Sequence, residues 1–367
     1  MDDFNSVVLY IGVFSASVLT LLFSQYFWKI NIVYYRFYIV ISLLIPSIFV
    51  GLRYKVGTDY ETYVIIYNKV NQLTYIEFLN TNNYEVGFFT LEKLSHWVGD
   101  VQFLFFLSSF LTLLFLYFAL KQYIGKLSIT LGYILYIFTV FPDSLNAVRQ
   151  QLAIAIIVFS LKYIFEKKLI KFIIYVFLAS TFHITAIIVI PFYFLFHYSG
   201  QEIDRKDKYK IVLRVLFLIS IVIFIASYGY FLDLTAKLSG VERFSEYSNE
   251  SGTGNNREII LNFFILLIML FMRRSLIIFD GRNKLYIYFL IVGFLLSLSS
   301  IWNPIVSRMA SYFDIALIFL IPSLVASLET SLSKYIGSLL VCMYSIFYFI
   351  LVYYTLGFSE IIPYNIK

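Results

Sequence analysis

Charged residues, cysteine and histidine are all scarce in this sequence. Asp, Glu, Lys and Arg make up 14% of the 367 residues, against about 25% in an average soluble protein, while hydrophobic residues reach 60%. This composition excludes a water-soluble fold. A single cysteine, Cys342, excludes a disulfide framework and a thiolate metal site. With three histidines and no HExxH or CxxC motif, we expect no metal and no cofactor.

The net charge of +6 indicates membrane topology rather than a nucleic-acid partner. Membrane proteins carry an excess of Lys and Arg in their cytoplasmic loops, so we expect no nucleic acid to bind. The N-terminus, Met1-Asp2-Asp3, is acidic, whereas a signal peptide begins with basic residues. We therefore interpret the first apolar run as a permanent membrane span.

Long apolar runs recur along the whole chain. A helix that crosses a membrane needs about 20 apolar residues, or somewhat fewer when flanking side chains reach the interface. The runs predict an all-α polytopic protein, with about twelve transmembrane helices in a single domain over residues 1–367. The predicted spans are 7–28, 37–52, 101–120, 127–141, 151–165, 169–182, 184–196, 211–232, 258–272, 285–303, 308–328 and 335–356.

The positions of Lys and Arg predict which connections face the cytoplasm. The stretch 169–196 is either one long helix or two short helices that break near His183, and only the two-helix interpretation separates basic from non-basic connections. The basic side is cytoplasmic by the positive-inside rule. Both termini and the segments 53–100, 142–150, 233–257 and 303–307 then face outward, to the periplasm or the cell exterior.

Two of the outward segments are long enough to contribute to a site. Segment 53–100 mixes acidic and basic residues in a pattern typical of structured chain. Segment 233–257 is rich in Ser, Gly and Asn, which indicates a mobile loop.

The first polar constellation follows the second predicted span, from Arg53 to Tyr63. Thr58, with Glu61 three residues later, fits a capping box, so we expect a helix to begin here and lie along the membrane surface. Asp59 is then either a carboxylate favoured in a first helical turn or part of a site for a phosphate and a sugar. The residues alone leave both interpretations open.

Further polar side chains interrupt the apolar pattern on the same predicted side. Arg149 begins an apolar helix, where it either snorkels to lipid headgroups or binds phosphate oxygens with its forked guanidinium. His183 is either a structural donor or a site residue. Arg308 and Tyr312 lie four apart on one helix face, with Asp314 deeper in the span as a candidate partner for an arginine.

Several of these residues resemble the motifs of the EpsG family, which is similar to the Wzy O-antigen and capsule polymerases. The resemblance runs in order over residues 50–320. The motifs are Arg53-Tyr54-x-Val56-Gly57-Thr58-Asp59-Tyr60-x-x-Tyr63, Tyr84-Glu85-x-Gly87-Phe88, Asn146-x-x-Arg149-Gln150-x-x-Ala153, Phe182-His183-x-x-Ala186 with Pro191, and Arg308-x-x-x-Tyr312-Phe313.

The resemblance implies a membrane-embedded, GT-C-like glycosyltransferase of the bacterial plasma membrane. Such an enzyme transfers a growing glycan from undecaprenyl pyrophosphate to a new lipid-linked repeat unit on the outer face, for O antigen, capsule or exopolysaccharide. It implies partners in the lipid-linked oligosaccharide and polysaccharide, the bilayer, a chain-length regulator protein and a flippase. The implied site comprises acid or base candidates Asp59, Glu85 and His183, pyrophosphate ligands Arg53, Arg149 and Arg308, and sugar ligands Tyr60, Tyr63, Gln150 and Tyr312.

Two other functions fit many of the same residues. An O-antigen ligase would differ only in its acceptor. A lipid-linked oligosaccharide flippase would also be basic, aromatic and polytopic, but it would need polar residues along a path through both leaflets. Here the polar interruptions fall mainly on one predicted side, which favours the polymerase.

Overall fold

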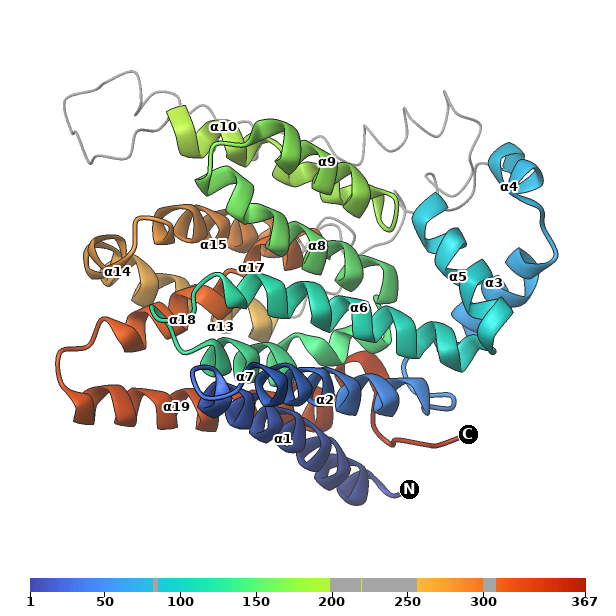
Figure 1. The fold of residues 1–367 in the computed structure, drawn as a ribbon, viewed down its shortest axis with the longest axis horizontal. Coiled ribbons are helices and arrows are strands. Elements are labelled where there is room, and N and C mark those ends of the chain that lie inside the picture. The colour runs from blue at the N-terminus through green and yellow to red at the C-terminus, as the bar shows by residue number, and fades with distance from the viewer. Residues whose placement is uncertain (82–84, 199–218, 220–255, 300–307) are drawn as a thin grey trace. The chain divides into compact units, whose positions relative to one another are not determined.

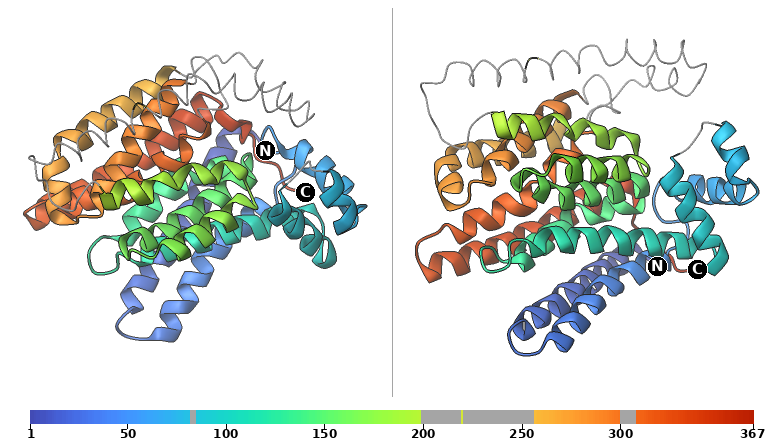
Figure 2. Two further views of the ribbon diagram at one scale, coloured as in Figure 1. Left: turned by 90° about the horizontal axis from the view of Figure 1, so that it is seen from above. Right: turned by 45° about the horizontal axis from the view of Figure 1, so that its top comes forward.

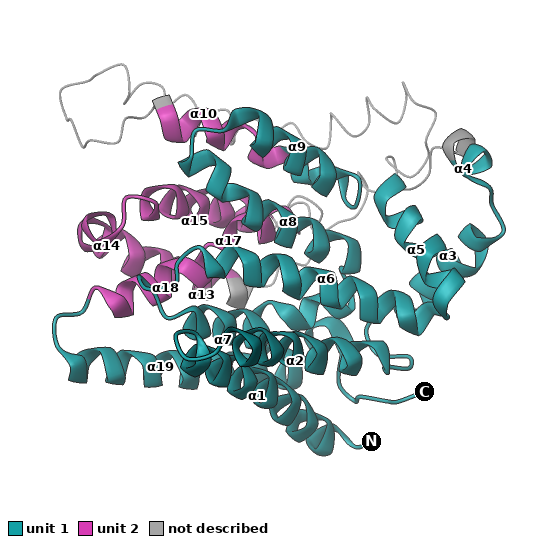
Figure 3. Cartoon of the chain, viewed as in Figure 1, with its two compact units in different colours: residues 1–187, 328–367 teal, residues 188–327 magenta. Residues whose placement is uncertain are grey.

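The protein is all-α, as the apolar runs predict. The computed structural model describes residues 1–81, 85–198, 219, 256–299 and 308–367, and the regular elements among them are helices (Figure 1). The chain forms two compact units: unit 1 comprises residues 1–187 and 328–367, and unit 2 comprises residues 188–327 (Figure 3).

Five helices of unit 1 are long and apolar enough to cross a membrane. The chain is therefore a multi-pass membrane protein. The first two, α1 and α2, pack against each other as an antiparallel pair (Figure 2). The five are α1 (Asp3–Phe27), α2 (Ile32–Gly51), α6 (Val101–Lys121), α8 (Val148–Phe165) and α19 (Ser331–Phe349), which continues to Thr355.

A sixth candidate span in unit 2 is bent. The Asn262–Phe271 part of α13 (Asn256–Phe271) and α14 (Arg273–Phe279) meet at 65° and are together long and apolar enough for one span. The other predicted spans correspond to shorter apolar helices, except 211–232, which lies outside the described residues apart from Ile219. The shorter helices are α7 (Ile129–Thr139), α9 (Leu169–Ser180), α10 (Pro191–Tyr198), α15 (Asn283–Leu298), α17 (Ser311–Asp314) and α18 (Leu317–Ala326).

Length explains why the structure yields fewer spans than the hydropathy pattern. A rise of about 1.5 Å per residue gives an 11-residue helix such as α7 a length of about 16 Å, against a hydrocarbon core of about 30 Å. The count of about twelve spans stays a prediction. The predicted break near His183 is confirmed, because α9 ends at Ser180 and a 3₁₀ turn, Ile184–Val189, follows before α10.

The helices of unit 1 bring most of its predicted outward segments to one end, which we call the polar end: residues 52–60, 141–149, 181–183 and 358–367. The C-terminal residues hold it together. The N–H of Tyr54 donates to the carbonyl of Asn365 (2.8 Å), and that of Gly57 to the carbonyl of Glu360 (3.1 Å). The turns that join α1 to α2, α6 to α7 and α8 to α9 lie at the other ends of these helices and carry Lys29, Lys126 and Lys167.

Segment 53–100 is structured, as its pattern predicts, and its regular elements are helices. It forms α3 (Tyr60–Asn71), α4 (Tyr75–Thr81) and α5 (Val86–Val98), and α5 packs against both α3 and α6. A small core of Val70, Phe78 and Phe89 joins them.

The capping box predicted at Thr58 and Glu61 is wrong. Helix α3 has Asp59 at its N-cap, with no side-chain cap hydrogen bond. The N–H of Asp59 donates instead to Oδ1 of Asn146 (3.3 Å), so a side chain from a distant segment replaces the local cap. A reciprocal Thr-Glu cap forms at the start of α4, between Thr74 and Glu77.

Unit 2 contains α10, α13, α14, α15, α17 and α18. Helix α15 packs against α13, α17 and α18, and the rings of Phe192, Phe289 and Phe313 contact one another. Most of the predicted loop 233–257 lies outside the described residues.

Candidate functional site

Arg149 is the centre of a polar cluster at the polar end of unit 1. A 3₁₀ turn, Phe141–Leu145, leads into α8, so Arg149 lies in the first helical turn. Its Nη1 donates to Oε2 of Glu85 at 2.7 Å, and its guanidinium lies 5.9 Å from the ring centre of Phe88. The side chain is 17% exposed. Arg149 thus contacts the α3–α5 segment and keeps some access to solvent.

Glu85 reaches Arg149 because the start of α5 is fixed to the turn after α9. The N–H groups of Gly87 and Phe88 both donate to the carbonyl of Thr181, at 2.8 and 3.3 Å. A Cβ atom at position 87 would collide with Thr181, which explains the glycine. The same contact brings Nδ1 of His183 to 3.5 Å from Oε1 of Glu85. One carboxylate therefore joins Arg149 and His183.

The charge balance keeps Glu85 ionised. Burial alone would raise its pKa, but the His183 imidazole and the positive charge of Arg149 outweigh that effect and lower the pKa of Glu85 to about 2. Glu85 is consequently a fixed anion at neutral pH. A group with so low a pKa is a weak general base and a strong orienting group.

Tyr63 completes the cluster from α3. Its side chain is 5% exposed and interacts electrostatically with Arg149. Burial raises the pKa of Tyr63 above its ordinary value, and the charge of Arg149 partly opposes the rise. Tyr60, one turn earlier, is 3% exposed, and its hydroxyl accepts from Nε2 of Gln102 at 3.0 Å.

Arg53 is close by but enclosed. It has no exposed surface, its Nη1 donates to the carbonyls of Val56 (3.2 Å) and Leu145, and its guanidinium lies 4.1 Å from the ring centre of Phe105. Burial lowers the pKa of Arg53 to about 10, with tyrosines such as Tyr10 opposing the shift, so it stays cationic at neutral pH. In this conformation Arg53 fixes the chain after α2, and Arg149 is the better placed cation for a ligand.

Asp59 and Gln150 lie beside this cluster. Asp59 is exposed and acts electrostatically on Tyr63. The loop before it turns at Gly57, where φ is +92° and a side chain would collide with Asn146. Gln150 follows Arg149 on α8 and is 7% exposed.

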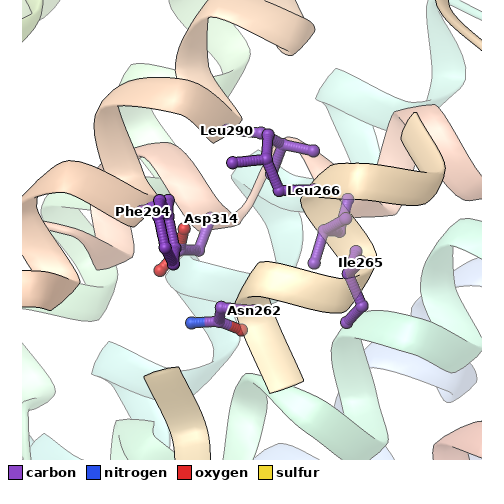
Figure 4. Close-up of a pocket in the computed structure, with 7 residues that line it drawn as sticks. Asn262, Ile265, Leu266, Leu290, Phe294 and Asp314 are labelled. Atoms are coloured by element: carbon purple, nitrogen blue, oxygen red, sulfur yellow. The ribbon is translucent and has the colours of Figure 1, made fainter. Parts of the chain in front are cut away.

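The remaining predicted residues, Arg308 and Tyr312, belong to unit 2. Arg308 is exposed, whereas Tyr312 is fully buried in α17. Asp314 faces a small pocket of unit 2 that Asn262 also lines, with apolar side chains such as Leu290 around them (Figure 4). Among the described residues, no group of three His, Cys, Asp or Glu side chains is arranged to hold a metal.

One acidic residue near the cluster was not singled out from the sequence. Glu92 on α5 is 1% exposed, and it interacts electrostatically with both Arg149 and Glu85. The spacing of Glu85, Phe88 and Glu92, at i, i+3 and i+7, was a usable signal because it places all three on one face of α5.

Comparison with known proteins identifies the family. No curated protein and no solved structure gives a significant match. The model of the EpsG family matches residues 36–366, almost the whole chain. This family is linked to exopolysaccharide biosynthesis. The chain therefore belongs to the EpsG family.

Proposed function

We propose that this protein is a polysaccharide polymerase of the bacterial plasma membrane. It transfers a growing glycan from undecaprenyl pyrophosphate to the sugar end of a new lipid-linked repeat unit, at the outer face. The observation that carries the proposal is the cluster in which Glu85 joins Arg149 (2.7 Å) to His183 (3.5 Å) at the polar end of unit 1. Membership of the EpsG family supports a role in polysaccharide biosynthesis, and the cluster around Glu85 supports glycosyl transfer as the reaction.

Arg149 is the proposed ligand of the pyrophosphate. Glycosyl transfer breaks the bond between the anomeric carbon and a phosphate oxygen, so negative charge grows on the leaving pyrophosphate. A guanidinium in a partly dry site stabilises that charge more strongly than one in water. Arg149 lies in the first turn of a candidate membrane-spanning helix, and we expect the end of such a helix to lie near the lipid headgroups. The lipid chains of donor and acceptor would stay in the bilayer while their sugars reach the α3–α5 segment.

His183 is the proposed general base for the acceptor hydroxyl. A carboxylate beside Nδ1 favours the tautomer that carries its proton on Nδ1 and leaves the lone pair on Nε2. Nε2 then takes the hydroxyl proton as the oxygen attacks the anomeric carbon, and the pyrophosphate departs with the bonding electrons. Glu85 orients the imidazole and balances the charge that forms on it. Asp59, exposed next to Tyr63, is placed to contact the acceptor sugar.

The sidedness of the site is part of the proposal. The polar end of unit 1 gathers most of the unit 1 segments that the charge pattern assigns to the outside, and the lysine-bearing turns lie at the opposite helix ends. Undecaprenyl-linked units on the outer leaflet would meet Arg149 directly. In this scheme the flippase that delivers the units is a separate protein.

Deletion of the gene, followed by electrophoresis of the surface glycan, tests this function. A polymerase deletion is expected to leave a product with a single repeat unit in place of a long ladder. Loss of all surface glycan with accumulation of cytoplasmic-side intermediates would contradict the proposal and indicate a flippase. Free long polymer that fails to reach its final acceptor would indicate a ligase.

A further inference from the structure

A buried carboxyl group lies behind the proposed pyrophosphate ligand. Glu92 is 1% exposed, and its Oε1 has no hydrogen-bond partner among the described residues. Burial of a carboxyl oxygen without a partner costs folding free energy. The packing of α5 against α3 and α6 does not by itself require an acid at this position, so the geometry points to a role in the site.

The spacing along α5 places Glu92 on the same helix face as Glu85, whose carboxylate holds the Arg149 guanidinium. Phe88, whose ring lies under the guanidinium at 5.9 Å, is three residues after Glu85 and four before Glu92. These spacings put the three side chains on one helix face. Glu92 interacts electrostatically with Arg149 and with Glu85. Any negative charge on Glu92 would therefore act on Arg149 alongside the charge of Glu85.

The surroundings of Glu92 keep it protonated at neutral pH. Burial raises the pKa of Glu92 to about 8, the charge of Arg149 opposes the rise, and the charge of Glu85 adds to it. Lys93 is its charged neighbour on α5, and its amino group donates to the carbonyl of Asn71 at 3.1 Å.

Other elements around Glu92 contribute further polar groups. Helix α3 contributes the hydroxyl of Tyr67 and the side chain of Asn71. Asp100, the residue just before α6, interacts electrostatically with Tyr67. Arg149 is thus the principal cation that a deprotonated Glu92 would face.

We propose that Glu92 is a positioning residue that must stay uncharged for Arg149 to bind a pyrophosphate anion, so that alkaline pH weakens the site. This inference rests on the proposed function, since it assigns the pyrophosphate to Arg149. With Glu92 neutral, Glu85 alone shares the charge of Arg149, and the guanidinium attracts the anion. With Glu92 ionised, the charges of two carboxylates act on the guanidinium and the incoming anion meets a net negative site.

The test measures binding of undecaprenyl pyrophosphate to the full chain in nanodiscs, between about pH 6.5 and about pH 9.5. Wild-type affinity is expected to fall about tenfold or more, with a midpoint near the pKa of Glu92. Glu92→Gln keeps the shape and neutrality of the protonated acid, so its affinity should match the wild type at pH 6.5 and stay nearly constant. Glu77→Gln, at an exposed glutamate of α4, is the matched control and should follow the wild type.

The outcomes separate this inference from the proposed function. If the wild type binds and Glu92→Gln shows the same alkaline loss, the role of Glu92 is refuted and the polymerase proposal stands. If the wild type binds no undecaprenyl pyrophosphate at any pH, both fail. Thermal unfolding of each variant controls for misfolding, and Glu92→Gln is expected to be at least as stable as the wild type at neutral pH, because its amide avoids the cost of keeping a buried acid protonated.

Discussion

Replacement of Arg149 by lysine distinguishes a phosphate ligand from a lipid anchor. Lysine keeps the positive charge but loses the two parallel N–H groups of the guanidinium. A lysine snorkels to headgroups as well as an arginine does. In the structure, however, Arg149 is 17% exposed and contacts Glu85 and Phe88. We therefore expect Arg149→Lys to insert normally and to be severely impaired in polymerisation.

The size of the loss follows from the contacts that lysine cannot restore. Removing one charge-assisted donor to a developing anion in a partly dry site costs about 2.7–4 kcal/mol, or about 10²–10³-fold in rate. The guanidinium also hydrogen-bonds to Glu85 while it interacts electrostatically with Tyr63, and a single ammonium group does not reproduce that arrangement. The loss should therefore lie toward the upper end of this range.

The assay is the repeat-length distribution of surface glycan in a deletion strain that carries each variant at matched membrane abundance. Arg36→Lys is the control, because Arg36 is exposed near the start of α2, toward the end of that helix opposite the polar end. Arg36→Lys should give wild-type ladders, and Arg149→Lys mostly single repeats. A wild-type ladder from Arg149→Lys would refute the phosphate-ligand role and leave a snorkelling anchor.

Three further predictions follow from the structure. The pKa of Glu85 is lowered from 4.5 to about 2, so ionised Glu85 stabilises the fold above pH 4.5, and this stability is lost as the pH falls to about 2. Glu85→Gln should remove this acid dependence, which is on the order of 3 kcal/mol. Thermal unfolding of both proteins between these pH values measures it. Asn146→Ala should lower the free energy of unfolding by about 1–3 kcal/mol, because a buried amide that bonds two distant backbone segments is lost, and chemical denaturation of the detergent-solubilised protein measures it. In a Cys342→Ser background, a membrane-impermeant thiol reagent should label Asn249→Cys but not Lys167→Cys in intact cells, and the reverse labelling would overturn the topology.

The sequence predicted the helical class, the break near His183 and the ordered nature of segment 53–100, because each leaves a local pattern. Apolar runs mark helices, and a polar interruption marks a break. Five candidate residues come together in unit 1: Tyr63, Glu85, Arg149, His183 and, beside them, Asp59. The sequence predicted that these residues lie on one side of the membrane, from their motif resemblance and the charge pattern. Their spacing along the chain did not predict the distances between them.

Features that depend on contacts between distant segments could not be predicted. The cap of α3 comes from Asn146, so the local Thr-Glu signal misled. Residues 358–367 fix the loop after α2 through backbone hydrogen bonds, which carry no side-chain pattern. Arg53 has the residue type of a phosphate ligand, and only packing against Phe105 reveals that it is enclosed. Apolar runs also do not reveal where a helix ends, and several predicted spans form helices of 10–17 residues.

In vitro polymerisation tests the central claim most directly. The purified full chain, reconstituted in liposomes with lipid-linked repeat units as the only substrate, should convert them into a ladder of lipid-linked oligomers and release undecaprenyl pyrophosphate. His183→Ala, reconstituted in parallel, should slow this conversion by about 10²–10⁴-fold, because its Nε2 is the proposed base. Liposomes that move the repeat units between leaflets without joining them would contradict the account.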